Sequence, residues 1–251
     1  MSRWVRVHKG SSGLEGGGRA GKSQTMQGSR EEKTFSDRAM NDSLYRGDGR
    51  DSKQWFRNNS NVDELISQMG YKERDAFTHW TEGDYMYGQQ WGEWDDMDKK
   101  SQTETQIFDN ILDQTRVDNN VMVARLSTAE LIFGAGVKTT TLDALRAMEG
   151  ETAYARGSMS FAAAAEGLTI GDTSKQVEYH LHIPGGSKGV GMWIGDDRIN
   201  PWFGNTQREF MTNRNAQYKI GKTVYDANRG VFIVDLTFKG IVKHDYGHKG
   251  K

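Results

Sequence analysis

Residues 177–194 read "VEYHLHIPGGSKGVGMWI". The first seven residues alternate apolar and polar side chains, Pro184 and two glycines interrupt the alternation, and a second apolar stretch follows. Alternation with a period of two is typical of a half-buried strand, and a Gly-rich break between two such stretches is typical of a turn. The segment therefore predicts two strands joined by a turn.

The sequence on either side of this segment divides into a helical part and a strand-rich part. Between residues 62 and 114, apolar side chains recur at helical spacing, as in Leu65, Ile66 and Met69. After residue 120, a short helix is predicted at 139–148, and the other segments have the length and patterning of strands: 121–126, 152–161, 209–221, 222–226 and 230–240. Helices followed by strands predict an α+β domain with a largely antiparallel sheet system.

The N-terminal 60 residues have a different composition. Residues 9–60 are rich in Gly, Ser, Asn, Arg and Asp and poor in aliphatic side chains, which predicts a basic extension that is either flexible or ordered by a partner. Before it, "RWVRVH" (3–8) has the pattern of a single strand. We therefore expect an extension over 1–60 and one catalytic domain over 61–245.

Composition excludes several classes of function and location. The 251 residues carry a net charge of −1, so the chain has no strong overall attraction to nucleic acid or anionic lipid. There is no cysteine, which excludes disulfides, thiolate metal sites and cysteine nucleophiles. No long apolar run and no signal-peptide pattern occur in the sequence, so we expect a cytoplasmic protein without a membrane partner.

Residues 16–23, "GGGRAGKS", match the phosphate-loop pattern G-x-x-x-x-G-K-[ST]. A working phosphate loop lies between a buried strand and the N-terminus of a helix, because loop amides and the helix dipole bind the phosphates together. Here the flanking residues are polar and lack both patterns. We interpret the match as part of a flexible basic linker.

Three short elements with chemically useful side chains occur in a fixed order. They are Arg125 in "VMVARL", Ser158 and Ser160 in "RGSMSF", and Gln207 and Glu209 in "NTQREFM". This order resembles the Arg, Ser-Thr-Ser, Gln/Glu-x-Glu signature of mono-ADP-ribosyltransferases of the bacterial toxin and phage type. Three flanking segments are also similar to that family: "FTHWTEGDYMYGQQW", "VEYHLHIPGGSKGVGMWI" and "EFMTNRNAQYKI". The similarity extends over about residues 70 to 240.

The resemblance implies a helical lobe followed by two packed, mostly antiparallel sheets with a cleft for NAD between them. It also implies transfer of ADP-ribose from NAD, as co-substrate, to a macromolecular acceptor. In this interpretation Glu209 faces the positive charge that develops on the ribose as nicotinamide leaves. Ser158 orients that carboxylate with Ser160 as local support, and Arg125 holds the dinucleotide through its planar fork of donors.

The acceptor side is implied by the residues before Glu209. Residues two apart on a strand share a face, so Gln207 and Glu209 can point into one cleft. In the resembling family, Gln at this position goes with an asparagine or glutamine side chain or a guanine base rather than arginine. In the preceding "RINPWFGN" (198–205), Trp202 and Phe203 are aromatics that can stack on a base or pack against a protein.

Some positions depart from the family pattern or leave alternatives open. Met159 replaces the middle Thr, and no aromatic follows in 162–176, so Phe161 or Tyr179 would have to cover the nicotinamide. Arg116 competes with Arg125 as the cofactor clamp. His180 and His182 share a strand face without a third ligand, so no metal is predicted. A non-catalytic binding or structural protein with the same fold, such as a virion or effector component, is the alternative function.

Overall fold

The computed structural model describes residues 4–6, 49–81, 90, 94–134, 137–163, 176–201 and 208–247. The phosphate-loop match at 16–23 lies outside the described residues. So do Trp202, Phe203 and Gln207, three of the residues predicted to form the site.

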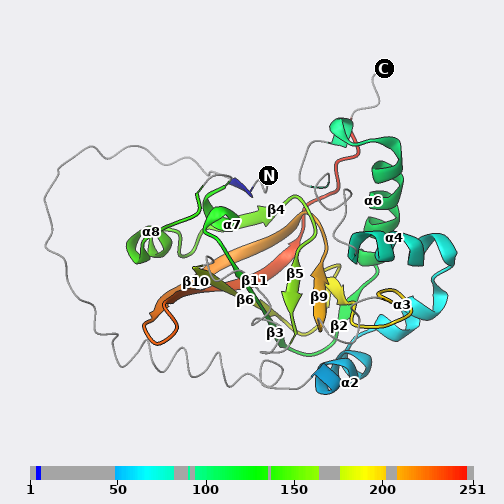
Figure 1. Cartoon of the computed structure of the whole chain (residues 1–251), viewed down its shortest axis with the longest axis horizontal. Helices are drawn as coiled ribbons and strands as arrows, with labels where there is room; N and C mark the ends of the chain where they lie inside the picture. Colours follow the sequence, from blue (N-terminus) through cyan, green and yellow to red (C-terminus); the bar gives the residue numbers. More distant parts are fainter. Residues whose placement is uncertain are drawn as a thin grey trace, which may run out of the picture.

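The helices of the first half form one group on one side of the sheet (Figure 1). Phe77 and Phe108 stack with their ring centroids 4.4 Å apart, and this contact joins two of these helices, α4 and α6. The predicted helical lobe is therefore confirmed. Its members are α2 (Gly49–Asn59), α3 (Val62–Gln68), α4 (Tyr71–Thr81), the short 3₁₀ helix η1 (Trp94–Asp96) and α6 (Lys99–Leu112). Two shorter helices, α7 (Glu130–Phe133) and α8 (Leu142–Arg146), lie between later strands.

The strands are numbered along the chain. They are β1 (Trp4–Arg6), β2 (Arg116–Val117), β3 (Val121–Ser127), β4 (Thr152–Ala155), β5 (Ser160–Ala162), β6 (Val177–Ile183), β7 (Ser187–Lys188), β8 (Gly191–Trp193), β9 (Glu209–Thr212), β10 (Ala216–Asp226) and β11 (Val231–Ile241). Nine of them form a sheet in the order β1-β4-β10-β11-β6-β3-β5-β9-β8, and β2 pairs with β7. Among the described strand pairs only β6 and β11 run parallel.

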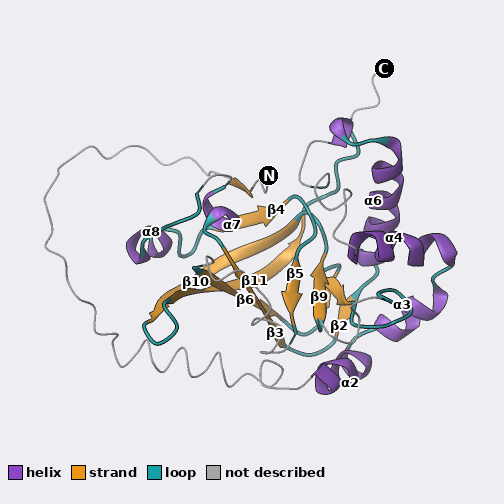
Figure 2. Ribbon diagram, in the orientation of Figure 1, coloured by secondary structure: helices purple, strands orange, loops and turns teal. Residues whose placement is uncertain are grey.

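The strands of the large sheet run in two directions in Figure 2, and we call the two groups its arms. One arm runs from β1 to β3, and the other contains β5, β9 and β8. The arms meet between β3 and β5 at one residue pair, Ala124 with Ala162. The α+β class with mostly antiparallel strands is confirmed, and the structure adds that hydrogen bonding is continuous between the two arms.

Helix α2 lies inside the range that the sequence predicted to be an extension. Its Phe56 is fully buried and stacks on Phe210 and Trp193, with ring centroids 5.3 and 6.5 Å apart. Helix α2 therefore packs on the strands of the predicted catalytic domain, although it precedes the predicted boundary at 61. Composition missed α2 because a short polar helix is stabilised mainly by tertiary packing of a few side chains.

Within the described residues, no helix is long and apolar enough to cross a membrane.

Candidate active site

The junction between the two arms of the sheet brings together three residues predicted to form the site. Glu209 begins β9 and pairs with Ala162 of β5, whose opposite neighbour is Ala124 of β3. Arg125 follows Ala124 on β3, and Ser160 begins β5. Segments about 85 residues apart in the sequence are therefore adjacent at this junction because the short strand β5 pairs with both β3 and β9.

Glu209 is a buried acid with two polar neighbours. Its side chain accepts a hydrogen bond from the Ser160 hydroxyl and lies within electrostatic range of the Arg125 guanidinium. Burial raises the pKa of Glu209 above its usual 4.5, whereas Ser160 and Arg125 act in the opposite direction by favouring the carboxylate. A buried carboxyl with a raised pKa in a polar cluster is typical of a functional site.

Arg125 connects the two arms of the sheet through its side chain. Its Nη1 donates a hydrogen bond to the backbone carbonyl of Ser160 at 2.7 Å. Its Nε is buried and has no hydrogen-bond partner among the described residues. Because native structures rarely leave a buried donor unpaired, this guanidinium retains donor capacity for a ligand oxygen.

The serine beside the carboxylate is Ser160 and not Ser158, which corrects the sequence prediction. Ser160 of β5 pairs with Met211 of β9. Glu209 lies two residues before Met211 on β9, so the side chains of Ser160, Met211 and Glu209 share one face of the sheet. Ser158 precedes β5, and its backbone N–H donates to the Gln90 side chain at 3.3 Å. The Ser158 hydroxyl is buried without a hydrogen-bond partner among the described residues.

The two aromatics proposed to cover a nicotinamide are core residues. Phe161 is 1% exposed and Tyr179 is fully buried, and both belong to the main hydrophobic cluster. The Tyr179 hydroxyl donates to the carbonyl of Thr128 at 3.0 Å. Their positions therefore do not support contact with a bound nicotinamide.

The alternative clamp, Arg116, does not lie in the cluster. It is in β2, its side chain is about half exposed, and its Nε contacts Asp118 at 2.6 Å. The guanidinium that acts on Glu209 is that of Arg125. Arg125 is accordingly the better placed of the two.

The two histidines of β6 contact carboxylates. His180 Nε2 lies 2.5 Å from Glu178, and His182 Nε2 lies 2.9 Å from Asp235. Within the described part of the chain, no group of three or more His, Asp or Glu side chains is placed to hold a metal ion.

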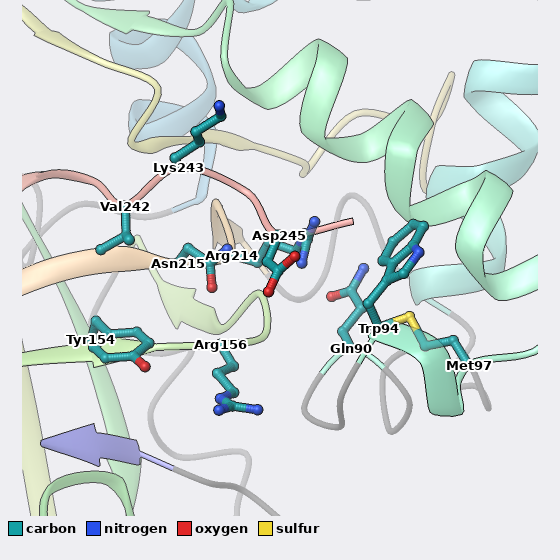
Figure 3. Close-up of a pocket in the computed structure, with 10 residues that line it drawn as sticks. All are labelled: Gln90, Trp94, Met97, Tyr154, Arg156, Arg214, Asn215, Val242, Lys243 and Asp245. Atoms are coloured by element: carbon teal, nitrogen blue, oxygen red, sulfur yellow. The ribbon is translucent and has the colours of Figure 1, made fainter. Parts of the chain in front are cut away.

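A cavity of about 150 Å³ lies apart from this cluster and was not anticipated from the sequence. Figure 3 shows Gln90 and Trp94 on one side of it and Tyr154 and Arg156 on the other. Arg214 also lines it, and its guanidinium is held by Asp109 in a buried ion pair with contacts of 2.6 to 2.8 Å. Arg214 lies in the "NRN" of residues 213–215, but no sequence pattern indicated that Asp109 would be its buried partner.

Comparisons with known proteins give a likeness at the level of the fold. No protein-family model matches the chain, and no curated protein sequence is significantly similar to it. Similar solved structures include Plx2a, an ADP-ribosyltransferase toxin from Paenibacillus larvae, with 18% identity over 78% of this chain and 98% of that chain and a TM-score of 0.64.

Two further structures give similar values. C3stau2 from S. aureus, solved with NAD, has 14% identity over 76% of this chain and 95% of that one, with a TM-score of 0.60. The C3 exoenzyme of Clostridium limosum has 16% identity over 79% and 98%, with a TM-score of 0.59. The chain therefore has the fold of these ADP-ribosyltransferase structures.

Proposed function

We propose that this protein transfers ADP-ribose from NAD to a macromolecular acceptor and releases nicotinamide. The observation that carries the proposal is the meeting of Glu209, Ser160 and Arg125 at the junction of the two sheet arms. The likeness of the whole fold to ADP-ribosyltransferase structures, one of them solved with NAD, supports it.

The chemistry requires these three kinds of side chain. When the bond between nicotinamide and ribose breaks, positive charge develops on the ribose, so a fixed carboxylate nearby stabilises the transition state. Glu209 supplies that carboxylate, and the Ser160 hydroxyl holds it in one orientation. Arg125 binds the anionic part of NAD through its free donor capacity, and its charge favours the ionised form of Glu209 against the effect of burial.

The acceptor class is a finer part of the proposal and depends on residues outside the described part of the chain. Gln207, two positions before Glu209, favours an asparagine or glutamine side chain or a guanine base over arginine. Trp202 and Phe203 supply aromatic surface for stacking on a base or packing against a protein. The sequence carries this part of the proposal.

The test is nicotinamide release from NAD by the purified protein, with Glu209→Gln and Glu151→Gln compared side by side. Glu151 is exposed, so its substitution is the matched control for loss of one carboxylate. We expect the control to retain wild-type activity and Glu209→Gln to lose most of it. Labelled NAD incubated with a cell lysate, followed by separate counting of protein and nucleic-acid fractions, then identifies the acceptor class. Wild-type protein that neither binds NAD nor releases nicotinamide would refute the proposal.

A further inference from the structure

We infer that helix α2, through Ser52, Phe56 and Arg57, is a positioning element for the Glu209 carboxylate. The inference rests on the proposed function, because it assigns a role in the reaction to side chains that do not contact NAD. It is unexpected from the sequence, which predicted this segment to be an extension outside the catalytic domain. Three independent contacts lead from α2 to the backbone around Glu209.

The first contact comes from Ser52, which is fully buried. Its hydroxyl donates to the carbonyl of Ala163 at 2.9 Å. The N–H of Ala163 donates to the carbonyl of Arg208 at 2.8 Å, directly before Glu209. Ser52 therefore holds the backbone of Ala163, and Ala163 in turn hydrogen-bonds the residue just before β9.

The second contact is apolar. Phe56 stacks on Phe210, the residue that follows Glu209, and on Trp193 at the end of β8. The next residue, Ile194, donates its N–H to the carbonyl of Glu209 at 2.8 Å. The ring of Phe56 thus packs on β9, the strand that carries Glu209, and on its neighbour β8. A buried ring in a close-packed interior transmits displacement.

The third contact is electrostatic. Arg57 approaches Asp196 and Asp63, each at 3.3 Å, and Arg198 contacts the same two carboxylates at 2.8 and 2.9 Å. Burial alone would raise the pKa of Asp196, but hydrogen bonds from Arg198 lower it to about 2, so this carboxylate is ionised at neutral pH. The network holds α2 and α3 against the segment that follows Ile194.

These contacts reach the residues directly before and after Glu209, Arg208 and Phe210, but none of them is with the Glu209 carboxylate. Loss of one of them is expected to shift the β5–β9 pair while the fold is retained. Transition-state stabilisation depends steeply on geometry, since a misplacement of about 1 Å can cost on the order of 100-fold in rate. None of these contacts involves Arg125, the residue proposed to bind NAD. We therefore expect their loss to lower kcat and to leave KM for NAD unchanged.

The experiment compares Ser52→Ala and Arg57→Met with Gln54→Ala in the full-length protein. Gln54 lies on the same helix, is exposed, and donates a hydrogen bond to the Asn58 side chain one turn later on that helix. For each variant, kcat and KM for NAD hydrolysis, the unfolding midpoint and amide hydrogen exchange at Ala163 and Ile194 are measured. We expect kcat to fall about tenfold or more in both test variants at unchanged KM, with faster exchange at the two amides.

The control should match wild type in every measurement. Unchanged kcat and unchanged amide protection in both test variants would overturn the inference. So would a loss of activity that only follows the loss of folded protein. If the wild-type protein neither binds NAD nor releases nicotinamide, the proposed function fails, and the exchange measurements alone decide whether α2 holds the backbone at Glu209.

Discussion

Replacing Ser160 by Ala tests which hydroxyl serves the carboxylate. In the folded protein burial raises the pKa of Glu209, while the Ser160 hydrogen bond and the Arg125 charge lower it. A hydrogen bond to a charged group contributes about 1.5–3 kcal/mol. Removing the Ser160 hydroxyl should therefore raise the pKa of Glu209 further above its usual value, because the carboxylate loses a hydrogen bond that favours its ionised form.

The sign of the effect on activity follows from the ionised form being the active one. Activity rises with pH as Glu209 loses its proton, so a higher pKa moves the acid limb of the pH–rate profile to higher pH. The assay is nicotinamide release from NAD across the acid and neutral range, for Ser160→Ala and Ser158→Ala. We expect the shift in Ser160→Ala alone. A shift in Ser158→Ala with Ser160→Ala unchanged would refute the assignment of the orienting hydroxyl.

Three predictions concern stability. Asp109→Asn leaves the buried Arg214 guanidinium without its partner carboxylate, so urea unfolding should show a loss of about 3–5 kcal/mol. Hydrogen bonds from His180 and Arg229 outweigh burial and lower the pKa of Glu178 to about 2, so its stabilising contribution is present above pH 4.5 and lost as the pH falls towards 2. The unfolding midpoint of Glu178→Gln should vary less with pH than wild type in that window, and equal slopes would contradict this. The raised pKa of Glu209 means that its ionisation destabilises the fold above that pKa, so Glu209→Gln should melt at a higher temperature than wild type at neutral pH. A lower melting temperature would show that its contacts stabilise the fold.

Much of the fold follows from local patterns in the sequence. The alternation in 177–183 predicted β6, and the apolar stretches at 121–126 and 230–240 predicted β3 and β11. These predictions were possible because a strand with one buried face shows a period of two, and a strand buried on both faces shows a continuous apolar run. Helix α2 could not be predicted in this way. Its stability depends on Phe56 meeting Phe210 and Trp193, residues more than 130 positions away in the sequence.

The sequence predicted the charged residues of the site but not which serine contacts the carboxylate. Arg125 and Glu209 were found from the order of short motifs, and the structure brings both to one junction. The choice between Ser158 and Ser160 depends on register, because a shift of one pairing step changes which side chain faces Glu209. Sequence alone does not fix that register where β5 has three residues and joins β3 at one pair.

The most direct test of the central claim is a crystal structure of the Glu209→Gln variant, which should not turn over substrate, with NAD bound. The account predicts the bond between nicotinamide and ribose about 3–4 Å from the side chain at position 209, with phosphate oxygens on Arg125. NAD bound elsewhere, for example in the cavity lined by Arg156 and Trp94, without contact to Arg125 or position 209, would contradict it.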